Sequence, residues 1–319
     1  MRWSCAIRRN GVNETTTEAD HQQENNDALE ADGASATRVV STINGEVEIP
    51  AEPQRIAATY YAGELAALGI RPAGTVTRLL PEQSPHLAGY TDDALDLGQF
   101  PPNMEAMVEL APDLIIAADF DELDYEQLSK IAPTVILPWT TDDVWGKLRT
   151  VAGILGKEAE AEVYIEAYET HAAEARAAIE GVIQEGETVS VIRFVGKGGV
   201  RGYAGRDVGH AFHHGLQLDM PPAMEALVEE DPNLTSTGNL SLEESLTYAG
   251  GDWLFILVTD KESDQAYQQA QELWSNLPAV QNQRVHLLPA DVWFTYDPIS
   301  MNHTLDEAVR LLVGGDEQG

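Results

Sequence analysis

The feature that most constrains the fold is a long helix-forming run in the middle of the chain. Residues 157–183 contain one glycine and no proline. Apolar and aromatic residues recur along the run at alternating steps of four and three, as on one face of an α-helix. A helix of about 25 residues would be about 37 Å long, more than a crossover between neighbouring strands requires. We therefore expect a rigid connection between two lobes. The stripe comprises Tyr164, Tyr168, His171, Ala175, Ala178 and Val182.

Short buried strands alternate with helices on both sides of this run. Residues 55–60 and 113–118 read as strands before it, and residues 188–194 and 252–259 read as strands after it. Such alternation is typical of parallel sheets covered by helices. The sequence therefore predicts an α/β protein of two Rossmann-like lobes with mostly parallel sheets, joined by one long helix. The predicted parts are a disordered acidic tether at 1–37, an N-terminal lobe at 38–156, the connecting helix at 157–184 and a C-terminal lobe at 185–319.

One sequence pattern occurs in both lobes. Asn103 and Ser241 each begin a predicted short helix, with Glu105 and Glu243 two places further on and a buried strand after the helix. An acidic residue in the first turn stabilises a helix by about 0.3–1 kcal/mol, which alone would explain both glutamates. Ser241 and Glu244 also form a capping-box pattern, which leaves Glu243 free. One free acid on each lobe would suit a partner with a basic residue on each half.

The charge of the chain is strongly negative, with 19 Lys and Arg against 53 Asp and Glu and a formal net charge of -34. A surface of this sign repels nucleic acid and anionic lipid headgroups, so both are excluded as partners. Within it lies a basic cluster, followed by the aromatic Tyr203. A solvated loop is the alternative, but a local reversal of charge favours capture of an anionic ligand. The cluster consists of Arg193, Lys197, Arg201 and Arg206.

A second set of candidate residues follows predicted strands. In open parallel sheets, ligands bind beyond the carboxyl ends of the strands. Each aromatic residue taken alone could equally be core packing. Together they indicate a broad cleft with stacking walls and a few charges. The set comprises Tyr60, Arg78, Trp139, Trp293 and Tyr296.

Three histidines form a possible metal site. His210, His213 and His214 are spaced so that they would share one helix face, which could hold a transition metal or haem. A partly exposed histidine cluster is the simpler interpretation, because no cysteine or HExxH pair is nearby. The sequence also lacks a GxSxG elbow and a distinct carboxylate pair, so an α/β hydrolase would lack its catalytic residues. We expect no enzymatic activity.

The start of the chain carries its single cysteine, Cys5, which can form no disulfide within the chain. Ser4 and Cys5 resemble the end of a bacterial lipoprotein signal, but no apolar stretch precedes them. An incidental thiol is the alternative to a lipid anchor.

Four segments resemble the iron-siderophore and cobalamin class of ABC-transporter substrate-binding proteins. The likeness extends over about residues 38–313 and is strongest in the repeated pattern that begins at Asn103. The class has a class III periplasmic-binding-protein fold, in which a rigid helix joins two α/β lobes. The matching segments are IPAEPQRI at 49–56, ELAALGIRPAG at 64–74, NMEAMVELAPDLII at 103–116, and WSNLPAV at 274–280 followed by RVH at 284–286.

The resemblance implies a non-catalytic, extracytoplasmic carrier, periplasmic or tethered at the cell surface, that delivers its ligand to a permease dimer with ATPase subunits. The expected ligand is an iron(III)-siderophore of hydroxamate or citrate-hydroxamate type. Such a ligand wraps its own iron, so no cofactor or direct metal ligand is expected. Haem or a metal ion is the alternative. The resemblance implies that Glu105 and Glu243 dock on the permease and that Arg201, Tyr203 and Trp293 line the cleft. The expected binding residues are Tyr60, Arg78, Trp139, Arg193, Arg201, Tyr203, Arg206, Trp293 and Tyr296.

Overall fold

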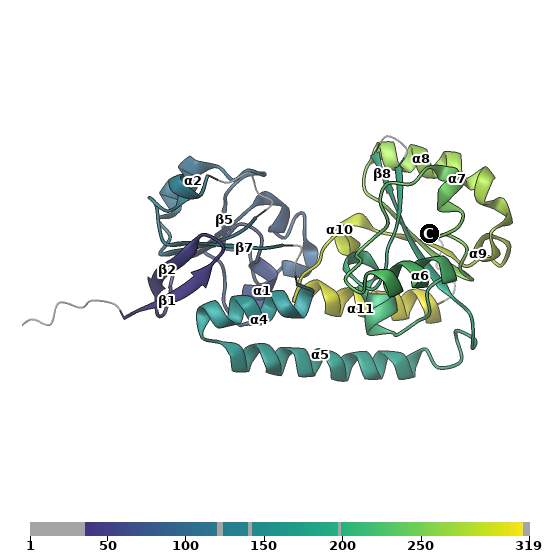
Figure 1. Cartoon of the computed structure of the whole chain (residues 1–319), viewed down its shortest axis with the longest axis horizontal. Helices are drawn as coiled ribbons and strands as arrows, with labels where there is room; N and C mark the ends of the chain where they lie inside the picture. Colours follow the sequence, from purple (N-terminus) through teal and green to yellow (C-terminus); the bar gives the residue numbers. More distant parts are fainter. Residues whose placement is uncertain (1–35, 120–123, 140–141, 197–198, 315–319) are drawn as a thin grey trace, which may run out of the picture. The chain divides into compact units, whose positions relative to one another are not determined.

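A computed structural model describes residues 36–119, 124–139, 142–196 and 199–314. The predicted tether up to residue 35, with Cys5, and the basic residue Lys197 lie outside these ranges. The described chain forms two α/β lobes, each built around its own sheet (Figure 1), which confirms the predicted fold class. Across these ranges, no helix has the length and apolar character needed to cross a membrane.

The N-terminal lobe is built on a five-stranded, wholly parallel sheet in the order β5-β4-β3-β6-β7. Its central strands β3 and β6 are apolar and buried on both faces, as expected of a parallel sheet covered by helices. An antiparallel hairpin, β1–β2, precedes this sheet and was not predicted. Its elements are β1 Thr37–Thr42, β2 Gly45–Pro50, β3 Ile56–Ala58, α1 Ala62–Ala67, β4 Gly74–Thr75, η1 Thr77–Leu79, η2 Pro85–Leu87, β5 Leu95–Asp96, α2 Met104–Leu110, β6 Leu114–Ala118, α3 Tyr125–Leu128, β7 Thr134–Leu137 and α4 Val144–Leu155.

The C-terminal lobe repeats the design with a four-stranded sheet in the order β11-β10-β8-β9. Three strands are parallel, and β9 returns antiparallel to β8 as the second arm of a hairpin. The segment predicted as a glycine-rich loop therefore contains an edge strand. The elements are β8 Val189–Val195, β9 Gly199–Gly202, η4 Asp207–Gly209, η5 His210–Gly215, α6 Pro222–Glu230, α7 Leu242–Ser245, β10 Trp253–Val258, α8 Lys261–Leu273, η6 Trp274–Asn276, α9 Pro278–Gln281, β11 Val285–Leu288, α10 Ala290–Trp293 and α11 Pro298–Val313.

The connecting helix α5 runs from Glu158 to Ala178, 21 residues. It ends before the predicted boundary, and the chain then turns through Gly181, whose φ of 80° suits glycine. Of the predicted stripe, Tyr168 and Ala175 are buried and Ala178 is exposed.

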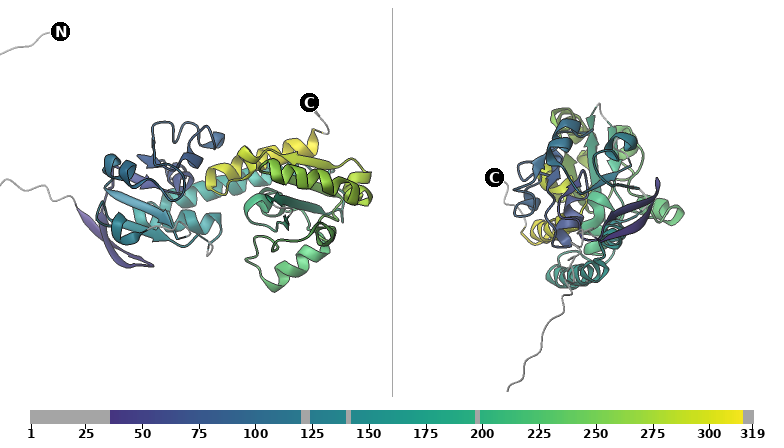
Figure 2. Two further views of the ribbon diagram at one scale, coloured as in Figure 1. Left: turned by 90° about the horizontal axis from the view of Figure 1, so that it is seen from above. Right: turned by 90° about the vertical axis from the view of Figure 1, so that its left-hand side faces the viewer.

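A second element, α11, also links the lobes. It packs against α1 of the N-terminal lobe, against α5, and against η5 of the C-terminal lobe. The left view of Figure 2 shows α11 (yellow) running from the junction of the lobes into the C-terminal lobe. One continuous hydrophobic core follows, in which Ile56 and Leu114 of one lobe join Val189 and Phe255 of the other through Leu305 of α11.

Candidate functional site

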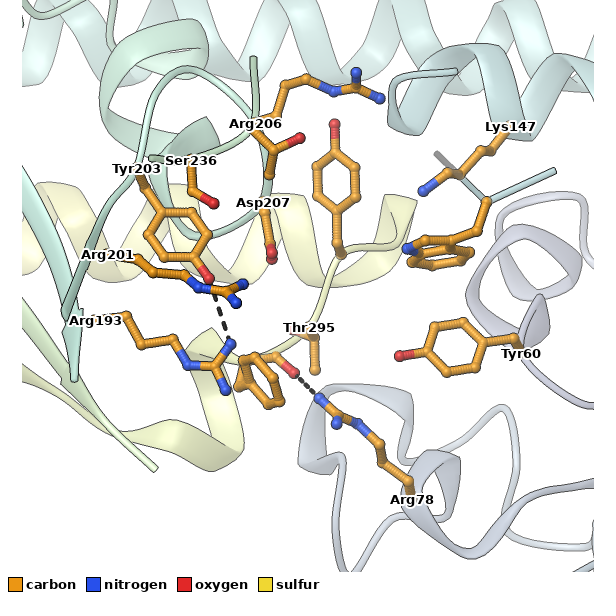
Figure 3. Close-up of a pocket in the computed structure, with 14 residues that line it drawn as sticks. Tyr60, Arg78, Lys147, Arg193, Arg201, Tyr203, Arg206, Asp207, Ser236 and Thr295 are labelled. Atoms are coloured by element: carbon orange, nitrogen blue, oxygen red, sulfur yellow. Dashed lines mark hydrogen bonds between the residues drawn. The ribbon is translucent and has the colours of Figure 1, made fainter. Parts of the chain in front are cut away.

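A pocket of about 380 Å³ lies between the lobes, within the usual size range of ligand sites. Both lobes and the segment 294–296, between α10 and α11, contribute to its wall (Figure 3). Eight of the nine predicted binding residues line it. The full lining is Tyr60, Arg78, Trp139, Lys147, Arg193, Arg201, Tyr203, Arg206, Asp207, Thr235, Ser236, Phe294, Thr295 and Tyr296.

The N-terminal wall is built at the carboxyl ends of parallel strands. Tyr60 follows β3, and Trp139 follows β7, which is separated from β3 by β6 in the sheet. The two rings meet edge to face with centroids 4.4 Å apart. Lys147 of α4 extends over this wall, with its Nζ 3.3 Å from the centroid of the Trp139 ring. The same Nζ lies 4.9 Å from the centroid of the Tyr296 ring. The wall thus combines stacking surfaces with one buried ammonium group.

The C-terminal wall is built on the β8–β9 hairpin. Arg193 and Arg201 are direct partners across this antiparallel pair. The Nη1 of Arg193 donates to the hydroxyl of Tyr203 over 3.3 Å, and the Nε of Arg201 donates to Oδ1 of Asn239 over 2.7 Å. Like charges directly opposite each other destabilise a strand pair. An anion between the two guanidinium groups would remove that cost.

The segment 294–296 joins the two walls. The guanidinium carbons of Arg78 and Arg193 lie 4.3 Å and 3.9 Å from the centroid of the same Phe294 ring. Arg78 also donates to the carbonyl oxygen of Phe294. Cation–π contacts of this kind orient a guanidinium while leaving its N–H groups available to a ligand. One ring therefore positions a cation from each lobe.

Arg206 and Tyr296 form hydrogen bonds between the two lobes at the pocket wall. Arg206 donates to the carbonyl oxygen of Asn233 over 3.1 Å and to the carbonyl oxygen of Asp142 in the other lobe. The hydroxyl of Tyr296 accepts from the backbone N–H of Val144 over 3.1 Å. Both side chains thus tie the C-terminal half of the chain to the start of α4.

The electrostatics of the pocket are dominated by its cations. Among the residues described, Asp207 is the only carboxylate in a lining that also holds four arginines and one lysine. Burial raises the pKa of Asp207 to about 6, although the nearby Arg193 and Lys147 act in the opposite direction. Burial lowers the pKa of Lys147 to about 8, opposed by Glu64. At neutral pH the pocket is therefore strongly positive inside a chain of formal charge -34.

Trp293 does not line the pocket, which corrects the sequence-based prediction. Its side chain is 1% exposed and stacks on Phe212 with ring centroids 5.2 Å apart. The cleft aromatic is the next residue, Phe294. Trp293 ends the one-turn helix α10 facing the core, and the chain then leaves the helix, so that Phe294 faces the opposite way. The sequence therefore predicts a cleft aromatic in this segment, but at Trp293 and not at Phe294, one residue further on.

Further lining residues were missed by the sequence analysis. Lys147 occupies a buried position on α4, where the period of the helix would place an apolar residue. Thr235 and Ser236 lie in a segment without regular periodicity, paired with the end of the β8–β9 hairpin through a bridge from Ser236 to Tyr203. Only the tertiary fold brings these residues to the site.

The histidine cluster does not form a metal site in the part of the chain that the structure describes. No group of three or more His, Cys, Asp or Glu side chains there could hold a metal ion. The three histidines lie on a π-helix, η5, with His210 buried and His214 exposed. Burial lowers the pKa of both His210 and His213, the latter to about 4, and His213 Nδ1 donates to the carbonyl oxygen of Leu218. Neutral, packed side chains are the interpretation that fits His210 and His213.

Glu105 and Glu243 lie in the first turns of α2 and α7, one helix on each lobe, and both are exposed. Asn103 caps α2 by accepting from the backbone N–H groups of Glu105 and Ala106. The predicted capping box of Ser241 and Glu244 is confirmed and occupies Glu244. Figure 1 shows α2 and α7 on the side of the two lobes that faces away from α5.

Two α/β lobes, a long helical connection and a ligand-sized pocket between them define a two-lobed solute-binding protein. The particular family follows from comparison with known proteins. A family model described as periplasmic binding protein matches residues 88–292, and the chain belongs to that family.

Relatives extend over most of the chain. The iron(3+)-hydroxamate-binding proteins YxeB and FhuD of Bacillus subtilis (strain 168) are 30% and 29% identical to it, over 88% and 82% of this chain and 87% and 82% of their own. The crystal structure of Staphylococcus aureus SirA complexed with staphyloferrin B is similar with a TM-score of 0.74 and 26% identity, over 88% of this chain and all of that one.

Proposed function

We propose that this chain is an extracytoplasmic binding protein that captures a ferric siderophore and delivers it to an ABC-type importer for iron uptake. The observation that carries the proposal is the inter-lobe pocket, which combines five cationic side chains with stacking aromatic rings. A ferric siderophore presents oxygen atoms around its iron and organic arms between them. Guanidinium groups suit the oxygens, and aromatic rings suit the arms.

The relatives support the same function. Two relatives that match more than four-fifths of this chain are named as iron(3+)-hydroxamate-binding proteins. Members of the family are solute-binding proteins, in agreement with a carrier that has no catalytic role. In the proposed complex the siderophore itself supplies the ligands of the iron, as the iron(3+)-hydroxamate ligands named for the relatives suggest.

The binding proposal is tested by fluorescence titration of the full chain. Trp139 lines the pocket, so a bound ferric siderophore should quench part of the tryptophan emission, with a dissociation constant of about 1 µM or tighter. Ferric siderophores, the same siderophores without iron, and haemin form the panel. Trp139→Phe should reduce the quenching amplitude and retain binding. Saturable binding of haemin without any binding of ferric siderophores would contradict the proposal.

For the delivery step, we propose Glu105 and Glu243 as the residues that contact the permease. The two acids are exposed, lie on different lobes and are not needed for capping, because Asn103, Ser241 and Glu244 perform that role. A loaded carrier that docks through one acid on each lobe would place the pocket between the two contacts.

A further inference from the structure

The cations of the pocket outnumber its carboxylates, since Asp207 is the one acid among the described lining residues. No ion pair within the described residues joins any of the five to a carboxylate. Their hydrogen bonds go instead to neutral oxygens, such as the Tyr203 hydroxyl, the Asn239 amide and three backbone carbonyls. Cationic side chains that a fold brings close together without forming ion pairs destabilise the protein unless an anion binds between them. The five are Arg78, Lys147, Arg193, Arg201 and Arg206.

Lys147 shows the imbalance most clearly. Its side chain is nearly buried, and its Nζ lies against the faces of Trp139 and Tyr296. Three acids oppose the effect of burial on Lys147, namely Glu64, Asp207 and Asp142, and Glu64, whose influence is the largest, is itself buried. Burial and the neighbouring Asp297 raise the pKa of Glu64 to about 8. Burial thus favours the neutral form of this carboxyl, and within the pocket lining a single carboxylate, Asp207, opposes five cations.

The cations are also distributed over the whole wall. Arg78 and Lys147 come from the N-terminal lobe, and Arg193, Arg201 and Arg206 from the C-terminal lobe. Arg193 and Arg201 are direct partners across a strand pair, so their side chains lie on the same face of the sheet and could donate to one anionic group. A ligand that satisfies this arrangement needs anionic groups on several sides of its surface.

We infer that the ligand is a net-anionic ferric chelate that carries free carboxylates, and that Lys147 determines this specificity together with the arginines. The inference rests on the proposed function and narrows it. A neutral trihydroxamate complex would fill the pocket without neutralising its cations. A cationic complex would add to the repulsion, since charges at close range in a partly buried site interact strongly.

The test compares three ferric complexes that all contain hydroxamates but differ in net charge. Ferric aerobactin, a citrate dihydroxamate, is anionic, ferrichrome is neutral and ferrioxamine B is cationic. Dissociation constants are measured by fluorescence titration of the full chain at pH 7. We expect the anionic complex to bind at least about 100-fold more tightly than the other two. Its affinity should fall as salt rises, because salt screens charge attraction.

Substitution of Lys147 provides the residue-level test. Lys147→Met should weaken binding of ferric aerobactin at least about tenfold and change ferrichrome binding less than about twofold. Arg201→Gln, at a partly exposed position, should show the same selective loss and serves where Lys147→Met reduces folding, which circular dichroism monitors. Lys157→Met is the matched control, because Lys157 pairs with Glu160 away from the pocket.

The outcomes separate the two proposals. If ferrichrome or ferrioxamine B binds as tightly as ferric aerobactin, or if Lys147→Met and Arg201→Gln weaken all complexes equally, the charge-based specificity is wrong and siderophore binding stands. If none of the three complexes binds, both proposals fail.

Discussion

At the scale of single residues, two neighbours in the sequence have different roles: Trp293 belongs to the core and Phe294 to the pocket. Trp293 is buried and stacked on Phe212, whereas Phe294 is partly exposed between two guanidinium groups. Trp293→Ala should lower the free energy of unfolding by about 3–5 kcal/mol, because it leaves a large cavity. Urea denaturation measures this change.

Phe294→Ala is the matched comparison. It should change stability by less than about 1 kcal/mol and weaken ligand binding about tenfold, because Arg78 and Arg193 lose the surface that orients them. Loss of binding in a Trp293→Ala protein of unchanged stability would show that the assignment to the core is mistaken.

A second residue-scale prediction concerns Glu64. Burial raises the pKa of this carboxyl from 4.5 to about 8. The folded state therefore holds a proton that the unfolded state releases above pH 4.5, so this group makes folding less favourable as pH rises from about 4.5 to about 8. Glu64→Gln cannot ionise and should remove that loss.

Thermal unfolding across this pH window provides the measurement. The melting temperatures of wild type and Glu64→Gln should be similar near pH 5, and the variant should melt higher near pH 8, by about 2–4 °C for each 1 kcal/mol gained. Glu109→Gln, an exposed acid on α2, is the control and should follow the wild type. Parallel curves for Glu64→Gln and the wild type would rule out a buried, proton-bound carboxyl.

The residues of the site differ in how far the sequence predicts them. Tyr60 and Trp139 follow strands and Arg193 lies near the end of β8, and strand ends are visible in the alternation of the chain. Lys147 gives no such signal, because it lies within an amphipathic helix, and its burial depends on the rings of Trp139 and Tyr296 that pack over it. Residues whose role comes from distant neighbours are found only once those neighbours are placed.

At the scale of elements, the close packing of α1 on α11 is critical. A Cβ atom at Gly63 would lie within 3 Å of the side chain of Asp297, which caps α11 and contacts buried His86 over 3.1 Å. Gly63→Ala should therefore destabilise the protein by about 1–3 kcal/mol through overpacking. Gly153→Ala on α4 meets nothing within 4 Å and should stabilise it by about 0.5–1 kcal/mol.

Differential scanning calorimetry of both variants tests this prediction. Melting temperatures should move in opposite directions, although each variant adds one methyl group to a helical glycine. A shift of the same sign and size in both would mean that helix propensity, and not the α1–α11 contact, controls stability at Gly63.

The elements that the sequence predicts best are those with a local signature. The buried strands β6 and β10 are continuous apolar runs, and the caps Asn103 and Ser241 mark the starts of α2 and α7. The edge strand β9 was not predicted because its glycines are typical of a loop. Its strand conformation depends on pairing with β8. The hairpin β1–β2 was not predicted because polar residues alternate with the buried Val47 and Ile49, which leaves only a weak apolar pattern in the sequence.

At the scale of the whole molecule, α5, α11 and the shared core resist hinge motion between the lobes. A large rotation would have to break a packed cluster that runs from Ile56 to Phe255, and such interiors deform little. The radius of gyration measured by small-angle X-ray scattering should therefore change by less than about 1 Å between the ligand-free and loaded protein. A contraction of several ångström would show that the lobes close as separate bodies.

Docking on the importer is the property that involves both lobes at once. Glu105→Lys and Glu243→Lys should each reduce siderophore uptake by cells at least about tenfold, because reversal of one charge places like charges together at the interface with the permease. Ligand affinity of the purified variants should stay within about twofold of the wild type, since neither residue lines the pocket.

The controls separate docking from the acidity of the protein as a whole. Glu109→Lys on α2 and Glu272→Lys on α8 reverse exposed acids on the same two lobes and change the net charge equally. If they reduce uptake as much as Glu105→Lys and Glu243→Lys, the effect belongs to the overall charge of -34 and not to a paired contact. If affinity falls in parallel with uptake, the two glutamates act on the ligand or on stability. If only Glu105→Lys and Glu243→Lys reduce uptake, a contact with the permease through one acid on each lobe explains the result.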